Sequence, residues 1–226
     1  MLGVTNRLAV LMACAVIFSL PLVTVVYQAT SSLNNDIRFA EREQKGMSYH
    51  IEMIDLLISM QKLRGLINIS RHSNIDEAIL TAQQADVRFW ISKVDVADQR
   101  YGLDLGLQQD WLKVRNTFNE LLGVRASRQH GDAGQEFTKN SLIIRNFMTF
   151  MENMVDKSNL NNDPESDSNL VADVLYNFIP ETTETLGQIR GLASGYMGSH
   201  NNRIDQLTNN EEKRLRALYN QLKMLD

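Results

Sequence analysis

The sequence predicts an all-α protein, in which an N-terminal transmembrane helix leads into antiparallel four-helix bundles. First, apolar residues recur at spacings of three and four through most of the 226 residues, and only three prolines interrupt them. Second, the run from Leu8 to Tyr27 contains no charged side chain. As a helix this run would be about 30 Å long, which matches the hydrocarbon thickness of a bilayer.

Residues 1–29 are predicted to form a cytoplasmic tip and a transmembrane helix. Arg7 precedes the apolar run, whereas the first charged residue after it is Asp36. Positive charge before the run places the N-terminus in the cytoplasm and the remaining chain outside. A cleaved secretory signal is the alternative, but the run is long for one and Ala29 is a weak cleavage site. We therefore expect an uncleaved anchor.

Residues 30–162 are predicted to form the first bundle. A helix over 32–71 is followed by a second helix, which starts at a capping box of Asn74 and Glu77. A loop at 101–106 leads to a third helix and then a fourth. The apolar seam of the first helix consists of Met53, Leu56, Met60, Leu63 and Ile67. The seam of the third helix consists of Leu107, Trp111, Val114, Phe118 and Leu121, and that of the fourth consists of Phe137, Ile144, Phe147, Met151 and Met154. Short connections between four such helices favour an antiparallel bundle.

Residues 163–226 are predicted to begin a second bundle. The segment 159–168, rich in Asn, Asp and Ser, breaks the helical pattern. A fifth helix over 168–199 should kink or restart at Pro180. A capping box from Thr208 to Glu211 opens a sixth helix. Because the sequence stops inside this periodic segment, we expect the second bundle to be incomplete here, with further helices and a second membrane span missing.

Two similar motifs supply the candidate site residues. In each, an arginine and a glycine follow an apolar seam residue, at Arg64-Gly65 and at Arg190-Gly191. An arginine at the edge of an apolar stripe can point into a groove between helices, where its planar fork of donors suits a carboxylate or another anion. Glycine lets a helix, a dimer partner or a ligand approach closely. The candidate ligand-binding residues are Gln61, Arg64, Gln188 and Arg190, and the candidate positions of close helix approach are Gly65 and Gly191.

Two alternatives stay open for the arginines: pairing with a nearby carboxylate, or lying in solvent along the bundle edge. We expect the two copies to lie in different bundles, so that they need not form one site. Trp90 and Trp111 fall on seams and are expected in the core.

Several function classes are disfavoured by composition. The chain shows no nucleophile beside a base, no paired carboxylates in a cleft, no phosphate loop and no cysteine pair, since Cys14 is its one cysteine. Its four histidines do not cluster with other metal ligands. We therefore predict a protein that is not an enzyme and that has no cofactor or metal. After the apolar run come 22 of the 23 basic residues and all 27 acidic ones, a net charge of −5. This balance argues against a nucleic-acid partner.

Two segments carry a family resemblance. Residues 37–49 with Gln61, Arg64 and Gly65 behind them resemble the first ectodomain helix of bacterial transmembrane receptors. Residues 159–168, followed by Ile179-Pro180 and by 186–191, resemble the mid-domain junction of the same ectodomains, which consist of two stacked helical bundles. The nitrate- and nitrite-sensing domain and the helical bimodular domain are of this type. Leu63 and Ile189 stand where the nitrate-sensing pattern usually has an acidic residue, which argues against nitrate but leaves another small anion open.

The resemblance implies a function in signalling. The chain is expected to be the periplasmic ligand-sensing region of an inner-membrane receptor, first of all a methyl-accepting chemotaxis receptor, that forms a homodimer through its first helix. A small-molecule ligand, such as an anion or carboxylate, would shift that helix by about 1–2 Å across the membrane. The alternatives are the sensor region of a histidine kinase or diguanylate cyclase, and a membrane-anchored helical adaptor that binds a partner protein.

Overall fold

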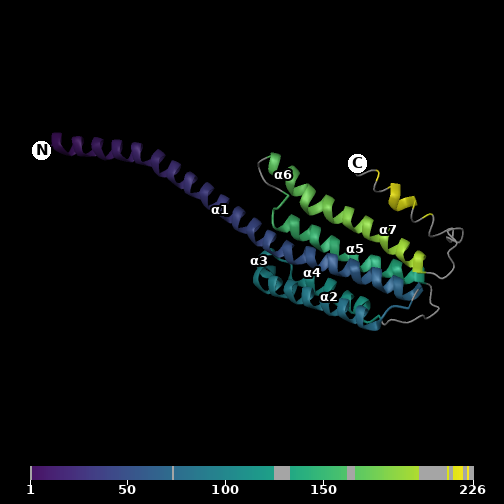
Figure 1. The fold of residues 1–226 in the computed structure, drawn as a ribbon. Coiled ribbons are helices and arrows are strands. Elements are labelled where there is room, and N and C mark those ends of the chain that lie inside the picture. Colours follow the sequence, from purple (N-terminus) through teal and green to yellow (C-terminus); the bar gives the residue numbers. More distant parts are fainter. Residues whose placement is uncertain are drawn as a thin grey trace. The chain divides into compact units, whose positions relative to one another are not determined.

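All regular structure in the described part of the chain is helical. The computed structural model describes residues 2–72, 74–124, 133–161 and 166–198, together with 213, 216–220 and 223. In chain order the elements are α1 (Leu2–His72), α2 (Glu77–Ala97), the π-helical segment η1 (Asp98–Gly102), α3 (Leu103–Leu105), α4 (Gln108–Leu122), α5 (Ala133–Lys157), α6 (Ser166–Asp173), the π-helical segment η2 (Val174–Phe178) and α7 (Ile179–Gly198) (Figure 1). The all-α class is confirmed for these residues.

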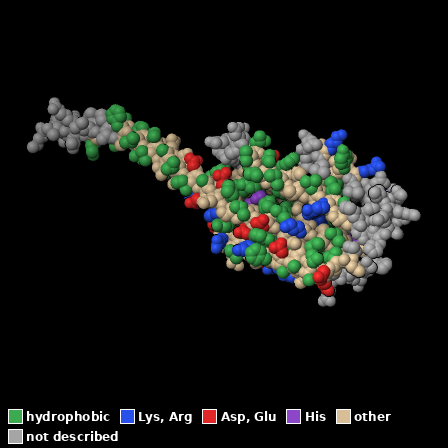
Figure 2. Space-filling model, in the orientation of Figure 1, with side chains coloured by type: hydrophobic (Ala, Val, Ile, Leu, Met, Phe, Trp, Pro, Cys, Tyr) green, Lys and Arg blue, Asp and Glu red, His purple; other side chains and the backbone are tan. Residues whose placement is uncertain are grey.

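The chain divides into two compact units, residues 1–42 and 43–226. In the first unit the apolar side chains from Val16 to Tyr27 are exposed, and Figure 2 shows a largely hydrophobic helix surface there. The helix that contains these residues has an 18-residue window apolar enough to cross a membrane, and none of that window is buried within the protein. A membrane anchor and an N-terminal signal sequence both meet this test of length and composition.

In the second unit, α2 runs antiparallel to α1. Ser59 of α1 donates a hydrogen bond to Asp86 of α2 at 2.6 Å, and Tyr49 of α1 donates to Asp98, the residue after α2, at 3.0 Å. Rising residue numbers in α1 therefore meet falling numbers in α2.

α5 runs antiparallel to both of the helices that it contacts here, α1 and α4. α5 is antiparallel to α1, because Arg64 lies beside Ser141 and Arg71 lies beside Glu136. α4 is antiparallel to α5, as two ion pairs show: Asp110 with Lys157 at 3.3 Å, and Glu120 with Lys139 at 2.9 Å.

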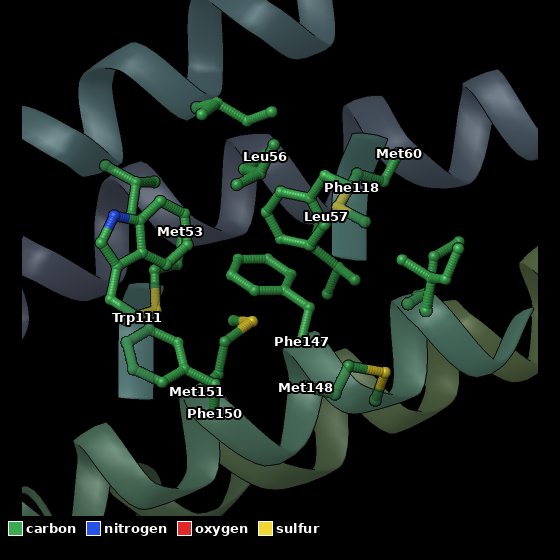
Figure 3. Close-up of a cluster of buried hydrophobic side chains, with 14 of the residues drawn as sticks. Met53, Leu56, Leu57, Met60, Trp111, Phe118, Phe147, Met148, Phe150 and Met151 are labelled. Atoms are coloured by element: carbon green, nitrogen blue, oxygen red, sulfur yellow. The ribbon is translucent and has the colours of Figure 1, made fainter. Parts of the chain in front are cut away.

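The seam predicted on α1 lies at the centre of the core (Figure 3). Met53, Leu56, Met60, Leu63 and Ile67 are each at most 1% exposed. Rings from α4 and α5 pack against this seam, with centroids 5.6–5.9 Å apart: Trp111 with Phe118 and with Phe150, and Phe118 with Phe147. Such ring pairs add about 0.5–1.5 kcal/mol each beyond their burial.

The two tryptophans have different environments. Trp111 is 1% exposed, which confirms its predicted core position. Trp90 is only partly buried and meets the edge of Phe89 at 5.1 Å between centroids. The core position predicted for Trp90 is therefore not confirmed: this side chain lies at the edge of the core.

Two predicted boundaries are corrected. The N-cap of α2 is Asp76, whose carboxylate accepts a hydrogen bond from the Ala78 backbone N–H at 2.9 Å, and Asn74 does not cap this helix. Residues 101–106 are not an open loop: η1 and α3 continue the helical path until Gly106, which has a φ of 67°. Asx side chains two residues apart compete for the same cap, and sequence alone does not rank them.

Near Pro180, where a break is predicted, the structure has the π-helical segment η2. Pro180 is the second residue of α7, and the π-helical segment ends two positions before it, at Phe178. Proline has no N–H to donate and is tolerated in the first turn of a helix. The helical path is continuous from Ser166 to Gly198, so the predicted break is a local change of helix type that ends two positions before the proline.

The predicted division at residue 163 does not separate two compact units, because residues 43–226 form one. α5 ends at Lys157, and Asn159, with a φ of 63°, turns the chain, while Leu160 N–H donates to the carbonyl of Val155 at 3.1 Å. α7 then packs on α1 and α5 instead of starting a separate bundle. The capping box predicted at 208–211 lies outside the described residues. That further helices follow stays a prediction.

Candidate functional site

The two Arg-Gly motifs lie on helices that pack against each other. Gln61 of α1 donates to Glu184 of α7 at 3.1 Å, and Asn68 of α1 donates to the carbonyl of Gly191 at 2.7 Å. Both bonds join residues 123 positions apart, so α1 and α7 run parallel with a constant register. The expectation that the two copies lie in different bundles is therefore wrong.

Arg64 does not lie at the edge of a groove. Its side chain is 0% exposed and forms an ion pair with Glu184, whose side chain is 1% exposed. The guanidinium also donates to Ser141 at 3.1 Å and lies 5.1 Å from the centroid of the Phe137 ring. Helices α2, α5 and α7 all contact α1, so the buried face of α1 is wider than its seam and includes Arg64. Pairing with a carboxylate, the alternative for this arginine, is what the structure has.

Glu184 is the residue that the sequence analysis missed. Its carboxylate accepts hydrogen bonds from three side chains, those of Gln61, Gln188 and Arg64. Gln188 donates at 2.7 Å and is itself buried, so it belongs to this cluster and does not line the groove described below. The sequence does contain a signal that could have identified Glu184. This acidic residue lies four positions before Gln188, and side chains at this spacing meet on one helix face.

The buried pair is only partly satisfied. The Nε and Nη2 atoms of Arg64 have no hydrogen-bond partner, although both are inaccessible. A Cβ added at Gly187 would lie 3.1 Å from Nη2, so the glycine leaves room for the guanidinium. Taking two charges out of water costs several kcal/mol each, and their attraction offsets this only with good geometry. We therefore expect the pair to fix the α1–α7 register more than it adds to stability.

An open groove of about 510 Å³ runs between α1 and α7 on the outer side of this cluster. Its lining residues are Ile58, Gln61 and Lys62 from α1, and Thr183, Leu186, Gly187, Ile189 and Arg190 from α7. Of the four candidate ligand-binding residues, the groove brings together Gln61 and Arg190 only. Arg190 is exposed, as is Lys62, which the sequence analysis did not single out.

The two candidate glycines differ. A Cβ at Gly191 would lie 2.8 Å from Cε2 of Phe137, so α7 approaches α5 closely there. A Cβ at Gly65 would meet nothing within 4 Å. The close helix approach predicted at Gly65 is therefore absent from the described structure.

A second set of titratable groups lies nearer the start of the unit. His50 is buried, its Nε2 has no partner, and its ring meets the edge of Tyr176 at 4.7 Å between centroids. Burial lowers the pKa of His50 to about 4. Burial also raises the pKa of Tyr49 above its usual value, and that of Asp98, to which Tyr49 donates. In the described part of the chain, His, Cys, Asp and Glu form no group of three or more suited to a metal ion.

No protein-family model, curated protein or solved structure matches the chain. The function is therefore inferred from the residues and their contacts.

Proposed function

We propose that this protein is the ligand-sensing region of a bacterial inner-membrane signal transducer, first of all a methyl-accepting chemotaxis receptor, with its second unit in the periplasm. The observation that carries the proposal is that α1 contains both the apolar candidate span and one wall of the groove. A small-molecule ligand in the groove would contact the same helix that enters the membrane.

The proposed architecture is an antiparallel four-helix bundle of α1, α2, α4 and α5, with α7 as a fifth helix on α1 and α5. The alternating directions of the four helices support it. In this arrangement the groove is the outer edge of the contact between bundle and fifth helix, so a ligand there acts on the position of α7 relative to α1.

A homodimer through α1 is part of the proposal. Met47, Ile51, Ile54 and Ile58 follow one another at spacings of four, three and four, which is the heptad pattern of parallel helix pairs. Met47, Ile51 and Ile58 are 51%, 59% and 40% exposed. A second copy would cover these side chains.

Ile58 supplies the link between ligand and dimer. It belongs to the heptad stripe and also lines the groove. A ligand that contacts Ile58 therefore changes the surface that the partner packs on. The ligand stabilises the packing of α1 in which the groove binds that ligand more tightly.

Thermal unfolding of the purified chain in detergent tests ligand sensing. The screen would comprise mono- and dicarboxylates, amino acids, nitrate and nitrite. We expect at least one ligand to raise the melting temperature, and Arg190→Gln to reduce that shift while Arg88→Gln, an exposed arginine on α2 outside the groove, leaves it unchanged. If no ligand raises it and a partner protein is captured instead, the adaptor alternative is favoured.

Disulfide cross-linking in membranes tests the dimer. Ile51→Cys in a Cys14→Ser background should cross-link readily between copies, because position 51 lies on the stripe. Arg88→Cys on α2 is the control and should stay monomeric. Equal cross-linking of both variants would contradict a dimer through α1. Among the output types, a methyl-accepting, kinase or cyclase domain on the cytoplasmic side of the receptor would decide.

A further inference from the structure

The lining of the groove between α1 and α7 combines two cations with apolar side chains, and this combination indicates a ligand class. We infer, on the basis of the proposed sensing function, that the groove binds a monocarboxylate with a flexible alkyl chain, and that Lys62 and Arg190 hold the carboxylate. Lys62 takes the role on α1 that the sequence analysis gave to Arg64.

The two cations lie on opposite walls of the groove. Lys62 belongs to α1 and Arg190 to α7. In the register of 123, Lys62 lies opposite position 185 of α7, so Arg190 is offset from it by about five residues, or about 7.5 Å along the axis. Long side chains from the two walls can bridge such an offset and meet one carboxylate between them.

The remaining surface of the groove is apolar. Its large side chains are those of Ile58, Leu186 and Ile189. Leu186 is 50% exposed although the other two apolar side chains line the same groove. Burial of an alkyl chain against these residues contributes about 0.8 kcal/mol for each methylene. A small inorganic anion would gain nothing from this wall, so the groove favours a ligand with a tail.

The other polar groups of the lining are already engaged. The Gln61 amide donates to Glu184 at 3.1 Å, and the Thr183 hydroxyl donates to the carbonyl of Pro180 at 2.9 Å. By contrast, neither Lys62 nor Arg190 forms a hydrogen bond or ion pair with any residue that the structure describes. Among the lining residues that the structure describes, none is acidic. An anionic ligand therefore meets two cations without a competing carboxylate at the surface.

The test is equilibrium dialysis of radiolabelled octanoate against the full chain in zwitterionic lipid nanodiscs, with empty nanodiscs as background. We expect saturable binding of one octanoate per chain. Lys62→Gln and Arg190→Gln should each weaken it about tenfold, and the double variant should abolish it, because each removes a charged hydrogen-bond donor. Arg88→Gln is the matched control and should bind as the wild type does. Leu186→Asn should weaken octanoate strongly and leave weak acetate binding unchanged.

The ligand class and the sensing function fail separately. If unlabelled 1-octanol displaces octanoate as well as unlabelled octanoate does, the carboxylate assignment is wrong. If nitrate, amino acids or a short dicarboxylate bind through Arg190 and octanoate does not, the alkyl monocarboxylate is wrong while sensing stands. If octanoate binds equally to the wild type and the double variant, the groove is not the site. If no ligand of the screen binds at all, the sensing proposal itself is overturned.

Discussion

Removing the charge of Arg64 should destabilise the second unit by about 3–4 kcal/mol at pH 7. In Arg64→Met the side chain keeps its bulk, but Glu184 stays as a carboxylate that is 1% exposed. Breaking one side of a buried ion pair typically costs about 3–5 kcal/mol. The amide groups of Gln61 and Gln188 still donate to this carboxylate, which favours the lower part of that range.

An independent limit comes from protonation, since an isolated buried carboxylate can take up a proton. For a glutamic acid of ordinary pKa, about 4.3, remaining protonated at pH 7 costs about 3.7 kcal/mol. The destabilisation of Arg64→Met should therefore not greatly exceed this figure, and it should shrink by up to about 1.4 kcal/mol for each pH unit of acidification. In Glu184→Leu the arginine cannot lose its charge, so its penalty should be larger and independent of pH.

Urea unfolding of the chain in detergent, followed by tryptophan fluorescence at pH 7 and pH 5, measures these differences. The double variant Arg64→Met/Glu184→Leu should recover most of the loss, because apolar side chains of similar volume replace a buried pair well. Arg71→Met is the control on the same helix: its pair with Glu136 is 13% and 27% exposed, and its loss should cost about 1 kcal/mol. If the Arg64 and Glu184 variants cost less than the control, or if their effects simply add, the buried pair does not hold the register as argued.

Three further outcomes are expected. The pKa of His50 is about 4 in the folded state and about 6.5 in the unfolded state, so the unfolded state binds more protons between these pH values. The free energy of unfolding should therefore fall as the pH drops from 6.5 to 4, by at most about 3.4 kcal/mol. In His50→Phe the urea midpoint should depend less on pH. Gly191→Ala should lower the melting temperature, since its Cβ would press on Phe137 at a cost of about 1–3 kcal/mol, whereas Gly65→Ala should raise it, by about 0.5–1 kcal/mol of stability. Asn159→Ala should cost about 1 kcal/mol and Asn159→Gly nothing by the same melting assay, because the φ of 63° suits glycine.

Much of the fold follows from local sequence. The seam on α1 was predicted residue by residue, since spacings of three and four keep side chains on one helix face. The turn after α5 was predicted from its asparagines, and Asn159 is the residue there with positive φ. Both signals depend only on neighbours within a few positions, which is why sequence was sufficient.

The α1–α7 contact was not predictable in the same way. Glu184 meets Arg64 only because the two helices are parallel in one register, 120 positions apart along the chain. A periodic pattern gives the face of a helix that is buried but not the helix that covers it. The division at 163 failed for this reason: a break in periodicity was interpreted as a domain boundary, although α7 returns to the same unit.

The two Arg-Gly copies hold the same place relative to an apolar stripe, yet one arginine is buried and the other is exposed. The difference comes from the number of neighbouring helices. α1 is contacted by α2, α5 and α7, which leaves no solvent beside Arg64, whereas Arg190 points from α7 to the open groove. Variants of the two arginines should therefore differ in their effects. Changes at Arg64 should lower the stability of the protein with or without ligand, whereas changes at Arg190 should weaken ligand binding with little effect on unfolding. A variant of Arg190 that destabilised the protein as much as Arg64→Met would show that the groove is part of the core, and the sensing proposal would lose its site.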